Sequence, residues 1–549
     1  MDFPRSLVLM TLFFSSLLLQ LSLPSLTSSS RDHSISSFHK CLINEFKRTN
    51  LPSSSTNSII ITPQNKSSYE YLLRQQNLRP GLISPVKPFL IVTPKNESEI
   101  QAVVRCSQKL GIQIRPRAGG HDYEGLSFTS KTPFVMLDLR NLNSVTIDLK
   151  SRTAWVQSGA TLGQLYYAIA RESKTLAFPG GVCPSVGVGG HISGGGYGML
   201  SRKYGLASDN VADARLVGSN GEIYSDHRSM PEDLFWAVQG GGGANFGIVT
   251  AFKVKLVVVP KTVTVFTIVR PSEPKNDATT RLVRKWQRVA VAANESLMLR
   301  VTLRSTGNSI VNRTSVASFT ALYLGRGREL SHAMRSEFPE LGLTNADFEE
   351  MSWIESVLYF AGLRNQSIDV LRSRDPLGPF GPSYYKGKSD YAGARGISTN
   401  GLQGMWRFLH EEDENRGAVE FSPCGGVLSE DLRRTSPHWS ECSFMIRYGA
   451  TWHEGGFDEM KRHVEWIRSL YGCMGAYVRT KMPRAAYINY RDLDLGSNGR
   501  GRNTSYEEAR VWGVKYFGDN FERLARAKAR VDAENIFWNE QSIPPLLPM

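Results

Sequence analysis

The chain has 549 residues, of which 41% are hydrophobic, so it is globular and longer than one hydrophobic core usually organises. The formal net charge is +14 at pH 7, yet Lys and Arg occur in scattered pairs, as at 433–434, and not in a tract interleaved with aromatic residues. This argues against nucleic-acid binding and favours a solvated basic surface, which also suits an acidic compartment or a polyanionic matrix.

The N-terminus carries one arginine, an apolar run from Leu7 to about Leu23 and then small hydroxylated residues. No basic stop signal follows the run, so a cleaved signal peptide over residues 1–28 is favoured over a membrane anchor. We therefore expect entry into the secretory pathway, residence in the apoplast or vacuole, and no stable membrane insertion. In that setting the Asn-X-Ser/Thr sequons predict glycosylated surface positions at Asn65, Asn96, Asn294, Asn312, Asn365 and Asn503.

The first half of the mature chain is predicted to be an α+β domain. Residues 29–79 are largely helical, because apolar residues recur at helical intervals in SFHKCLINEFKR and SYEYLLRQQNLR. Residues 80–260 alternate short strands with helices. One helix, in NESEIQAVVRCSQKLG, has Asn96 or Ser98 as its cap and Gly111 as its stop.

The second half of the chain has a different pattern of predicted strands and helices. Across residues 261–484, strands such as TVTVFTIV, SLMLRVTL and CSFMIRYGATW alternate with helices such as GFDEMKRHVEWIRSLYG. This pattern predicts an antiparallel sheet with helices on one face. Residues 485–549 form a tail that ends in a proline-rich segment.

Two glycine-rich loops each contain one candidate nucleophile: AGGHDYEG contains His121, and GGVCPSVGVGGHISGGGYG contains Cys183. Glycine lets backbone N–H groups approach a pyrophosphate without a Cβ in the way. The spacing excludes a Rossmann loop, because Ile192 stands where the third glycine belongs, and excludes a P-loop, because Pro382 replaces its first glycine. A dinucleotide held by another arrangement of loops stays open. Taken alone, His121 would more often hydrogen-bond its own loop.

The six cysteines contain no CxxC pair, and no His/Cys cluster has zinc spacing, so no structural metal is expected. An oxidising compartment favours at least one disulfide bridge. The residues alone leave its partners open among Cys41, Cys106, Cys183, Cys424, Cys442 and Cys473.

Five motifs in order make the resemblance specific: RAGGHDYEG, GGVCPSVGVGGHISGGGYG, QGGGGANFGIVT, MSWIESVLYF and YINYRDLDLG. Together they resemble the plant berberine-bridge-enzyme-like flavoproteins, which include cannabinoid-cyclising oxidases and have the vanillyl-alcohol-oxidase (PCMH-type) FAD fold. The resemblance runs from about residue 35 to the C-terminal NEQSIPP. It implies a two-part FAD domain, made of 80–260 with its N-terminal helical part and of 485–549, around an α/β substrate domain at 261–484. It also implies a disulfide between Cys41 and Cys106.

The resemblance implies a bicovalent FAD, with His121 bonded to the 8α-methyl and Cys183 to C6. Imidazole and thiolate are nucleophiles, and a doubly linked flavin is a stronger hydride acceptor. Val186 matches the position that controls oxygen access, and its small side chain resembles the oxidases, which implies O₂ as oxidant and H₂O₂ as product. His191 matches a residue near the flavin ribityl and N1 edge, although a structural role in its loop is equally open. The expected cofactor contacts are Arg117, Gly119, Gly120, His121, Cys183, Val186, Gly187, Gly189, His191, Tyr197 and Val249.

Hydride transfer requires a base for the substrate's hydroxyl proton. Tyr490 aligns with the active-site tyrosine of the cannabinoid-type enzymes, while a core tyrosine with a satisfied hydroxyl is the alternative. Arg491 is a candidate for lowering the pKa of Tyr490, but neighbours in a strand point to opposite faces. Tyr123 and Tyr197 match family residues near the substrate.

The strand CSFMIRYGATW departs from the family pattern. Met445 and Arg447 are expected on one face, where relatives commonly have Glu, Gln or Lys. Arginine is no base near neutral pH, but it can hold a carboxylate, phenolate or enone oxygen through forked hydrogen bonds. Arg300 is a candidate second cation, with a surface salt bridge as the alternative.

Two enzymatic functions stay open. The first is an O₂-dependent FAD oxidase of plant specialised metabolism that acts on a phenolic, alkaloid or carbohydrate, with or without oxidative cyclisation. The second, suggested by Arg447, is a flavin-scaffolded cyclase (Diels–Alderase) without net oxidation. A secreted binding protein on an inactive scaffold is disfavoured, because both flavin anchors and Tyr490 are present. The expected partners are a small-molecule plant metabolite and O₂, and the expected state is a monomer.

Overall fold

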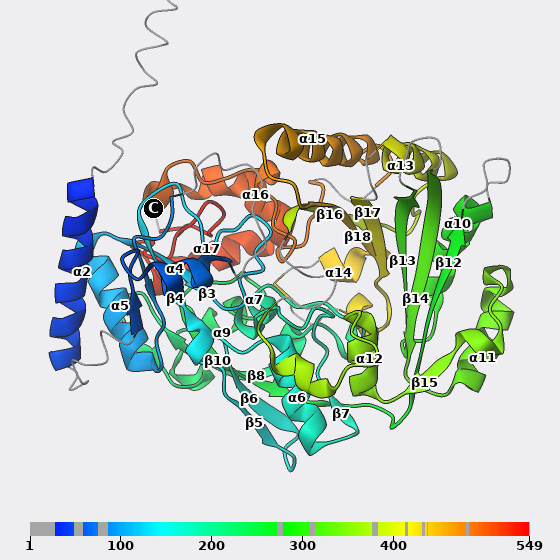
Figure 1. Cartoon of the computed structure of the whole chain (residues 1–549), viewed down its shortest axis with the longest axis horizontal. Helices are drawn as coiled ribbons and strands as arrows, with labels where there is room; N and C mark the ends of the chain where they lie inside the picture. The colour runs from blue at the N-terminus through cyan, green and yellow to red at the C-terminus, as the bar shows by residue number, and fades with distance from the viewer. Residues whose placement is uncertain are drawn as a thin grey trace, which may run out of the picture.

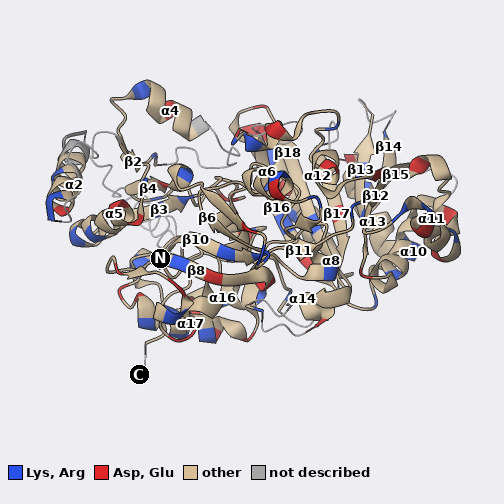
Figure 2. Cartoon of the chain, turned by 90° about the horizontal axis from the view of Figure 1, so that it is seen from below, with Lys and Arg blue, Asp and Glu red and all other residues tan. Residues whose placement is uncertain are grey.

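A computed structural model describes residues 28–48, 59–74, 86–271, 278–307, 313–375, 383–411, 416–430, 434–435, 438–478 and 483–547. Residues 1–27 of the expected signal peptide and the sequon at Asn312 lie outside this part of the chain. The asparagines of the other five sequons are solvent-exposed. Within the described residues, every helix is too short or too polar to cross a membrane. Basic and acidic residues are interspersed over helices such as α5, α11 and α17 (Figure 2).

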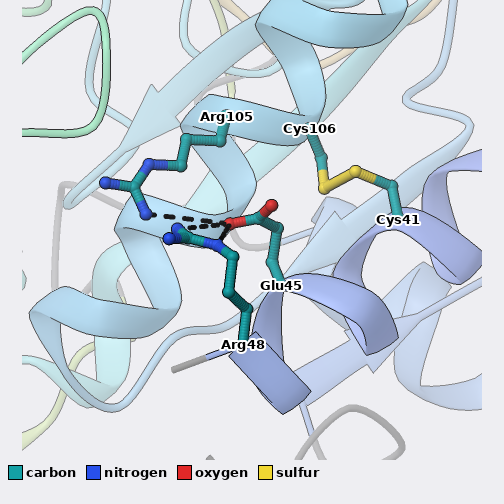
Figure 3. Close-up of a disulfide and its surroundings, with 5 residues drawn as sticks. All are labelled: Cys41, Glu45, Arg48, Arg105 and Cys106. Carbon is teal, nitrogen blue, oxygen red and sulfur yellow. Dashed lines mark hydrogen bonds and ion pairs between the residues drawn. A yellow bond between two sulfur atoms is a disulfide. The ribbon is translucent and has the colours of Figure 1, made fainter. Parts of the chain in front are cut away.

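The N-terminal helix α2 (Ser28–Arg48) is tied to α5 (Glu97–Leu110) by the disulfide between Cys41 and Cys106 (Figure 3). Beside it, the carboxylate of Glu45 lies 2.9 Å from Arg48 and 3.7 Å from Arg105 of α5. The expected bridge is therefore confirmed.

The helix α5 has the expected ends. The side chain of Asn96 accepts a hydrogen bond from the backbone N–H of Glu99 at 3.0 Å, and Gly111 ends the helix at φ 65°. The caps predicted from local residue chemistry are thus present, with Asn96 and not Ser98 at the start.

Two sheets form the N-terminal unit, which is the described part of residues 28–260. One has four strands in the order β1-β2-β4-β3, and the other has five antiparallel strands in the order β5-β6-β10-β8-β9. The strands are β1 (Ile60–Ile61), β2 (Leu90–Val92), β3 (Gln113–Arg117), β4 (Phe134–Asp138), β5 (Val145–Asp148), β6 (Thr153–Gln157), β8 (Val211–Val217), β9 (Ile223–Tyr224) and β10 (Ile248–Lys255). A short ribbon pairs β7 (Leu176–Ala177) with β11 (Val257–Val258). The helices beside them include α4 (Lys66–Arg74), α6 (Leu162–Glu172), α7 (Val188–Ser193), α8 (Ser201–Tyr204) and α9 (Leu234–Ala237).

A seven-stranded antiparallel sheet follows, as the strand patterns predict. Its order is β15 (Glu349–Met351), β12 (Val263–Pro271), β14 (Thr314–Tyr323), β13 (Leu297–Thr306), β17 (Gly417–Pro423), β18 (Phe444–Trp452) and β16 (Tyr384–Ala392). One face is apolar, with Val301, Phe421 and Ile446 fully buried in a common core. Helices cover this face, away from α2 and α5 (Figure 1): α10 (Ala278–Ala292), α11 (Gly327–Glu337), α13 (Thr399–Glu411) and α15 (Phe457–Met474).

Alternation along each strand turns the other residues to the opposite face, toward the N-terminal unit. This face carries Arg300, Glu420 and Arg447. A second disulfide, Cys424–Cys442, joins the end of β17 to the start of β18. Its pairing was not predicted from the sequence.

A residue of α8 joins the N-terminal unit to the sheet unit, which is the described part of residues 261–484. The guanidinium of Arg202, which is 1% exposed, donates hydrogen bonds to the backbone carbonyls of Ala293 at 2.7 Å, Cys424 at 2.9 Å and Val291 at 3.0 Å. A buried guanidinium satisfied by carbonyls on two segments of the sheet unit holds that unit in place.

The tail returns to the N-terminal unit. After an irregular stretch, α16 (Tyr506–Phe517) and α17 (Asn520–Val531) lie beside it (Figure 1), and α17 packs on α9. The buried Lys528 of α17 donates to the backbone carbonyl of Asn245 at 2.6 Å and pairs with Asp532. This return brings Tyr490 between the two units.

Candidate active site

A cavity of about 660 Å³ lies between the glycine loops, the polar face of the seven-stranded sheet and the C-terminal segment. Its volume is in the range of cofactor and ligand sites, about 300–1,000 Å³. The sequence-predicted residues that line it are Arg117, Gly119, Gly120, His121, Tyr123, Cys183, Val186, Gly187, Gly189, His191, Tyr197, Val249, Arg300, Arg447 and Tyr490. Segments distant in sequence thus converge on one site.

The two candidate flavin anchors share one hydroxyl. Ser185 Oγ lies 3.0 Å from His121 Nε2 and 3.5 Å from Cys183 Sγ. Burial lowers the pKa of His121 to about 4, so its imidazole is neutral near pH 7. Burial raises the pKa of the Cys183 thiol, and the hydrogen bond with Ser185 acts in the opposite direction. Both nucleophiles therefore face the same cavity in a common hydrogen-bonded group.

The glycines of the two loops have distinct roles. A Cβ at Gly119 would lie 2.2 Å from the backbone nitrogen of Gly187, and a Cβ at Gly187 would lie 2.2 Å from that of Gly119, so the two loops touch through these residues. By contrast, a Cβ at Gly190 would meet no atom within 4 Å, and Gly190 lines the cavity. The first pair brings His121 and Cys183 together, while Gly190 leaves backbone open to a planar or anionic ligand. These features fit FAD.

His191 and Arg117 line the cavity and also support its loops. His191 Nε2 accepts a hydrogen bond from the backbone N–H of Gly181 at 3.1 Å. Arg117 pairs with the fully buried Asp138 and donates to the backbone carbonyl of Leu72 at 3.0 Å. The structural role considered for His191 is therefore present alongside its position in the cavity wall.

A cluster of tyrosines forms one wall. Tyr490 stacks on Tyr123 with ring centroids 5.3 Å apart and an interplanar angle of 2°, and Tyr385 meets the edge of Tyr123 at 4.5 Å. Tyr487 contacts Tyr490 edge to face at 5.1 Å, and its hydroxyl accepts a hydrogen bond from the backbone N–H of Gly196 at 2.8 Å. The wall therefore joins the His121 loop, the C-terminal segment and β16.

The residues around Tyr490 form a turn and not a strand, with the Tyr490 N–H bonded to the Tyr487 carbonyl at 2.9 Å. Arg491 pairs with Asp122 at 3.0 Å. Burial and the charge of Glu420 raise the pKa of Tyr490 to about 12, against the lowering effect of Arg447 and Arg300. The cations that act on Tyr490 thus come from the sheet, and the expectation of a strand at Arg491 was wrong.

Three charged side chains meet on the polar face of the sheet. Glu420 of β17 lies between Arg300 of β13, with which it forms a close ion pair, and Arg447 of β18, at 3.4 Å. Arg447 also donates to the hydroxyl of Tyr385 at 3.2 Å. Burial raises the pKa of Glu420, but Arg300 and Arg447 lower it to about 2, so the carboxylate is ionised.

One expectation about this face was wrong, and one alternative is excluded. Met445 does not line the cavity, because it is fully buried in a hydrophobic core cluster that also contains Tyr391 and Trp439. Arg300 is not a surface salt bridge, because it lines the cavity and pairs with the buried Glu420.

Sequence reasoning missed Glu420, Tyr385 and Ser185. Ser185 had a local signal, since it lies two residues after Cys183 in the same loop. Glu420 had a weaker one, as an isolated carboxylate in the apolar strand GAVEFSP. Tyr385 lies three residues after Pro382, in the segment whose spacing excludes a P-loop, and nothing else in that segment indicates a site.

A buried ionic cluster is formed by residues next to the tyrosines in sequence. Lys386 of β16 pairs with Glu124 and, at 2.8 Å, with Asp492, while Lys388 pairs with Asp492 at 2.6 Å and Asp494 at 2.7 Å. Glu124 follows Tyr123 in sequence, and Asp492 lies two residues after Tyr490. The cluster therefore joins the three segments that carry the tyrosine wall.

Comparison with known proteins agrees with this geometry. A family model described as FAD binding domain matches residues 88–226, and one described as berberine and berberine like matches residues 486–544. Berberine bridge enzyme-like 18 of Arabidopsis thaliana is 43% identical over 540 residues, which cover 97% of this chain and 97% of that protein.

Two solved structures extend the comparison. Berberine bridge enzyme from Eschscholzia californica has a TM-score of 0.83 at 38% identity, covering 89% of this chain and 97% of its own. Phl p 4, a grass pollen allergen with glucose dehydrogenase activity, has a TM-score of 0.84 at 40% identity, covering 93% of this chain and 100% of its own. A double variant of that allergen, with Ile-to-Val and Asn-to-His changes, is described as a glucose oxidase. The chain belongs to the berberine-bridge-enzyme-like family of FAD-linked oxidoreductases.

Proposed function

We propose that this protein is a secreted oxidase with a bicovalent FAD that removes hydride from a small plant phenolic, alkaloid or carbohydrate and uses O₂ as oxidant. For an alcohol, the balanced reaction is R₂CH–OH + O₂ → R₂C=O + H₂O₂. The observation that carries the proposal is the convergence of His121, Cys183 and Tyr490 on one cavity. When bound there, FAD supplies the hydride acceptor and the site of O₂ reduction.

His121 and Cys183 are the attachment residues. A neutral imidazole has a free lone pair for bond formation, and burial keeps His121 in that form. The thiol of Cys183 must lose its proton to act as a nucleophile, and its hydrogen bond with Ser185 stabilises the thiolate. Ser185 therefore positions both groups.

Tyr490 is the proposed acceptor of the substrate's hydroxyl proton. Its ring is held by stacking on Tyr123 and by the edge of Tyr487, and Arg447 and Arg300 favour its phenolate form. Val186 lies half-buried in the wall of the same cavity, and we propose that its small side chain leaves O₂ access open. The oxidase activity described for the allergen variant supports the importance of small side-chain changes in this family.

Arg447 supports a second candidate, a cyclase that joins plant phenolics without net oxidation. Its guanidinium faces the cavity and is able to polarise a carbonyl through charge-assisted hydrogen bonds. An oxidase reduces its flavin anaerobically and releases peroxide in air, whereas a cyclase leaves the oxidation level of substrate and product unchanged.

We also propose a secretory-pathway location for a monomeric glycoprotein. Two disulfides and five solvent-exposed sequon asparagines support it. Secretion of the full chain from a eukaryotic host, with a mass decrease on deglycosylation, tests the proposal, and retention of an unmodified chain in the cytosol contradicts it.

The test of covalent flavin is acid precipitation of the purified protein. The pellet is expected to keep its flavin absorbance. Single changes His121→Ala and Cys183→Ala should each leave one linkage, and the double variant should release all flavin to the supernatant. Wild-type protein that releases all its FAD would rule out both attachments.

A further inference from the structure

The charges that line the cavity do not balance. Other lining arginines have a buried or half-buried carboxylate partner: Arg115 pairs with Glu540, Arg491 pairs with Asp122, and Arg117 pairs with Asp138, which Arg140 also contacts. On the sheet, two arginines share one carboxylate, since Arg300 and Arg447 both contact Glu420. On the polar face of the sheet, this group has a net charge of +1.

Several N–H groups of Arg300 and Arg447 have no strong acceptor among the described residues. A guanidinium has five N–H groups, and within the described part of the chain Arg447 makes one hydrogen bond to Tyr385 and one to Glu420. Among the residues that the structure describes, the acceptor for Nη1 of Arg300 is the thioether sulfur of Met199 at 3.7 Å, which is a weak acceptor. The side chain of Arg447 is 27% exposed, into the cavity. Unmatched donors with a surplus positive charge suit an anionic oxygen ligand.

This group lies on strands outside the two segments that match the family models. Its strands β13, β17 and β18 fall outside residues 88–226, matched by the FAD binding domain, and outside residues 486–544. The tyrosine wall adjoins it through the hydrogen bond from Arg447 to Tyr385. We therefore assign it to the substrate side of the cavity.

We propose that Arg300 and Arg447, with Glu420 shared between them, form an anion subsite that binds a carboxylate or phenolate oxygen of the substrate. The inference deepens the proposed function and rests on it. Glu420 holds both guanidinium groups in place and also lowers the attraction for the ligand, because its charge opposes that of an anion. Glu420 is thus a specificity-determining residue: it sets the net charge of the subsite at +1, and its neutral replacement makes it +2.

The test is calorimetric binding of small probes to the purified holoprotein at pH 7. Benzoate is expected to bind at least about tenfold more tightly than its neutral analogue benzamide, since a charge-assisted hydrogen bond corresponds to roughly 10- to 100-fold in affinity. Arg447→Met should remove this preference, and Glu420→Gln should strengthen benzoate binding by about tenfold while benzamide binding stays constant. Arg304→Met is the matched control, because Arg304 lies exposed on the same strand as Arg300.

Two measurements distinguish a subsite for a carboxylate oxygen from one for a phenolate oxygen. A carboxylate subsite binds benzoate with constant affinity from pH 6 to 8, whereas a phenolate subsite binds 4-nitrophenol only as that probe ionises. Benzamide binding as tight as benzoate, or an unchanged preference in Arg447→Met, overturns the proposal. Binding is measured without turnover, so it does not depend on the oxidase reaction. Absence of covalent flavin would refute the proposed function, whereas the benzoate measurement tests the anion subsite separately.

Discussion

Glu420→Gln is expected to speed flavin reduction at a fixed pH, because it removes a negative charge that raises the pKa of Tyr490. Burial and Glu420 raise that pKa to about 12. Near pH 8 only about one Tyr490 in 10⁴ is then a phenolate, and each pH unit multiplies that fraction by about ten. A proton transfer to this phenolate should therefore accelerate with rising pH from 6 to 9 without reaching a plateau.

The size of the effect follows from the same charges. At an effective dielectric constant of about 20, the interaction of two unit charges falls from about 2 to about 1 kcal/mol as their separation rises from about 8 to about 16 Å, and we take this range for Glu420 and the phenolate. Since about 1.36 kcal/mol corresponds to one pKa unit, Glu420→Gln should increase the phenolate fraction, and with it the reduction rate, by about 5- to 30-fold. Arg447→Met should change the rate in the opposite direction, because Arg447 lowers the pKa of Tyr490.

The assay is anaerobic stopped-flow reduction with saturating substrate, so that altered binding does not enter the rate. Arg304→Met should match wild type, and Tyr490→Phe should abolish the reaction. A rate independent of pH between 6 and 9, or equal rates in Glu420→Gln and wild type, would refute Tyr490 as the proton acceptor. Absence of flavin reduction together with product formation would favour the cyclase.

Two further outcomes are expected. Lys386→Met removes a cation from the buried Glu124 and Asp492 and should lower the free energy of unfolding by about 3–5 kcal/mol in calorimetry. Lys285→Met, at a more exposed ion pair, should lower it by at most about 1 kcal/mol. Equal thermal midpoints for the two variants would show that the buried cluster is not stabilising. Val186→Leu should slow reoxidation of the reduced enzyme in air, measured by recovery of flavin absorbance, and unchanged kinetics would remove Val186 from oxygen control.

Features set by local chemistry were predictable from the sequence. Asn96 caps its helix and Gly111 ends it through interactions within a few residues, so short windows contain the whole signal. The resemblance to a known family predicted that His121 and Cys183 lie at one site. The close approach of Gly119 and Gly187 explains how their loops meet.

Features that depend on pairing between distant segments were not predictable. The disulfide Cys424–Cys442 joins two strand ends whose approach follows from the antiparallel pairing of β17 with β18. Met445 has the same parity as Arg447 and was expected beside it in the wall. It is buried instead in a core cluster with Tyr391 and Trp439, which come from other segments, and a single strand carries no information about them.

The charged group on the sheet shows why substrate chemistry was harder to infer than the cofactor. In the register of β17 with β18, Glu420 lies directly opposite Arg447, and the pairing of β13 with β17 sets Thr302 opposite Glu420, which leaves Arg300 one pleat away on the same face. A slip of one residue in either pairing would turn Glu420 to the apolar face and separate it from both cations. Arg447 alone suggested a cation in the wall. Only the register makes it part of a triad in which two guanidinium groups share one carboxylate, and the remaining charge of +1 determines which substrates the wall favours.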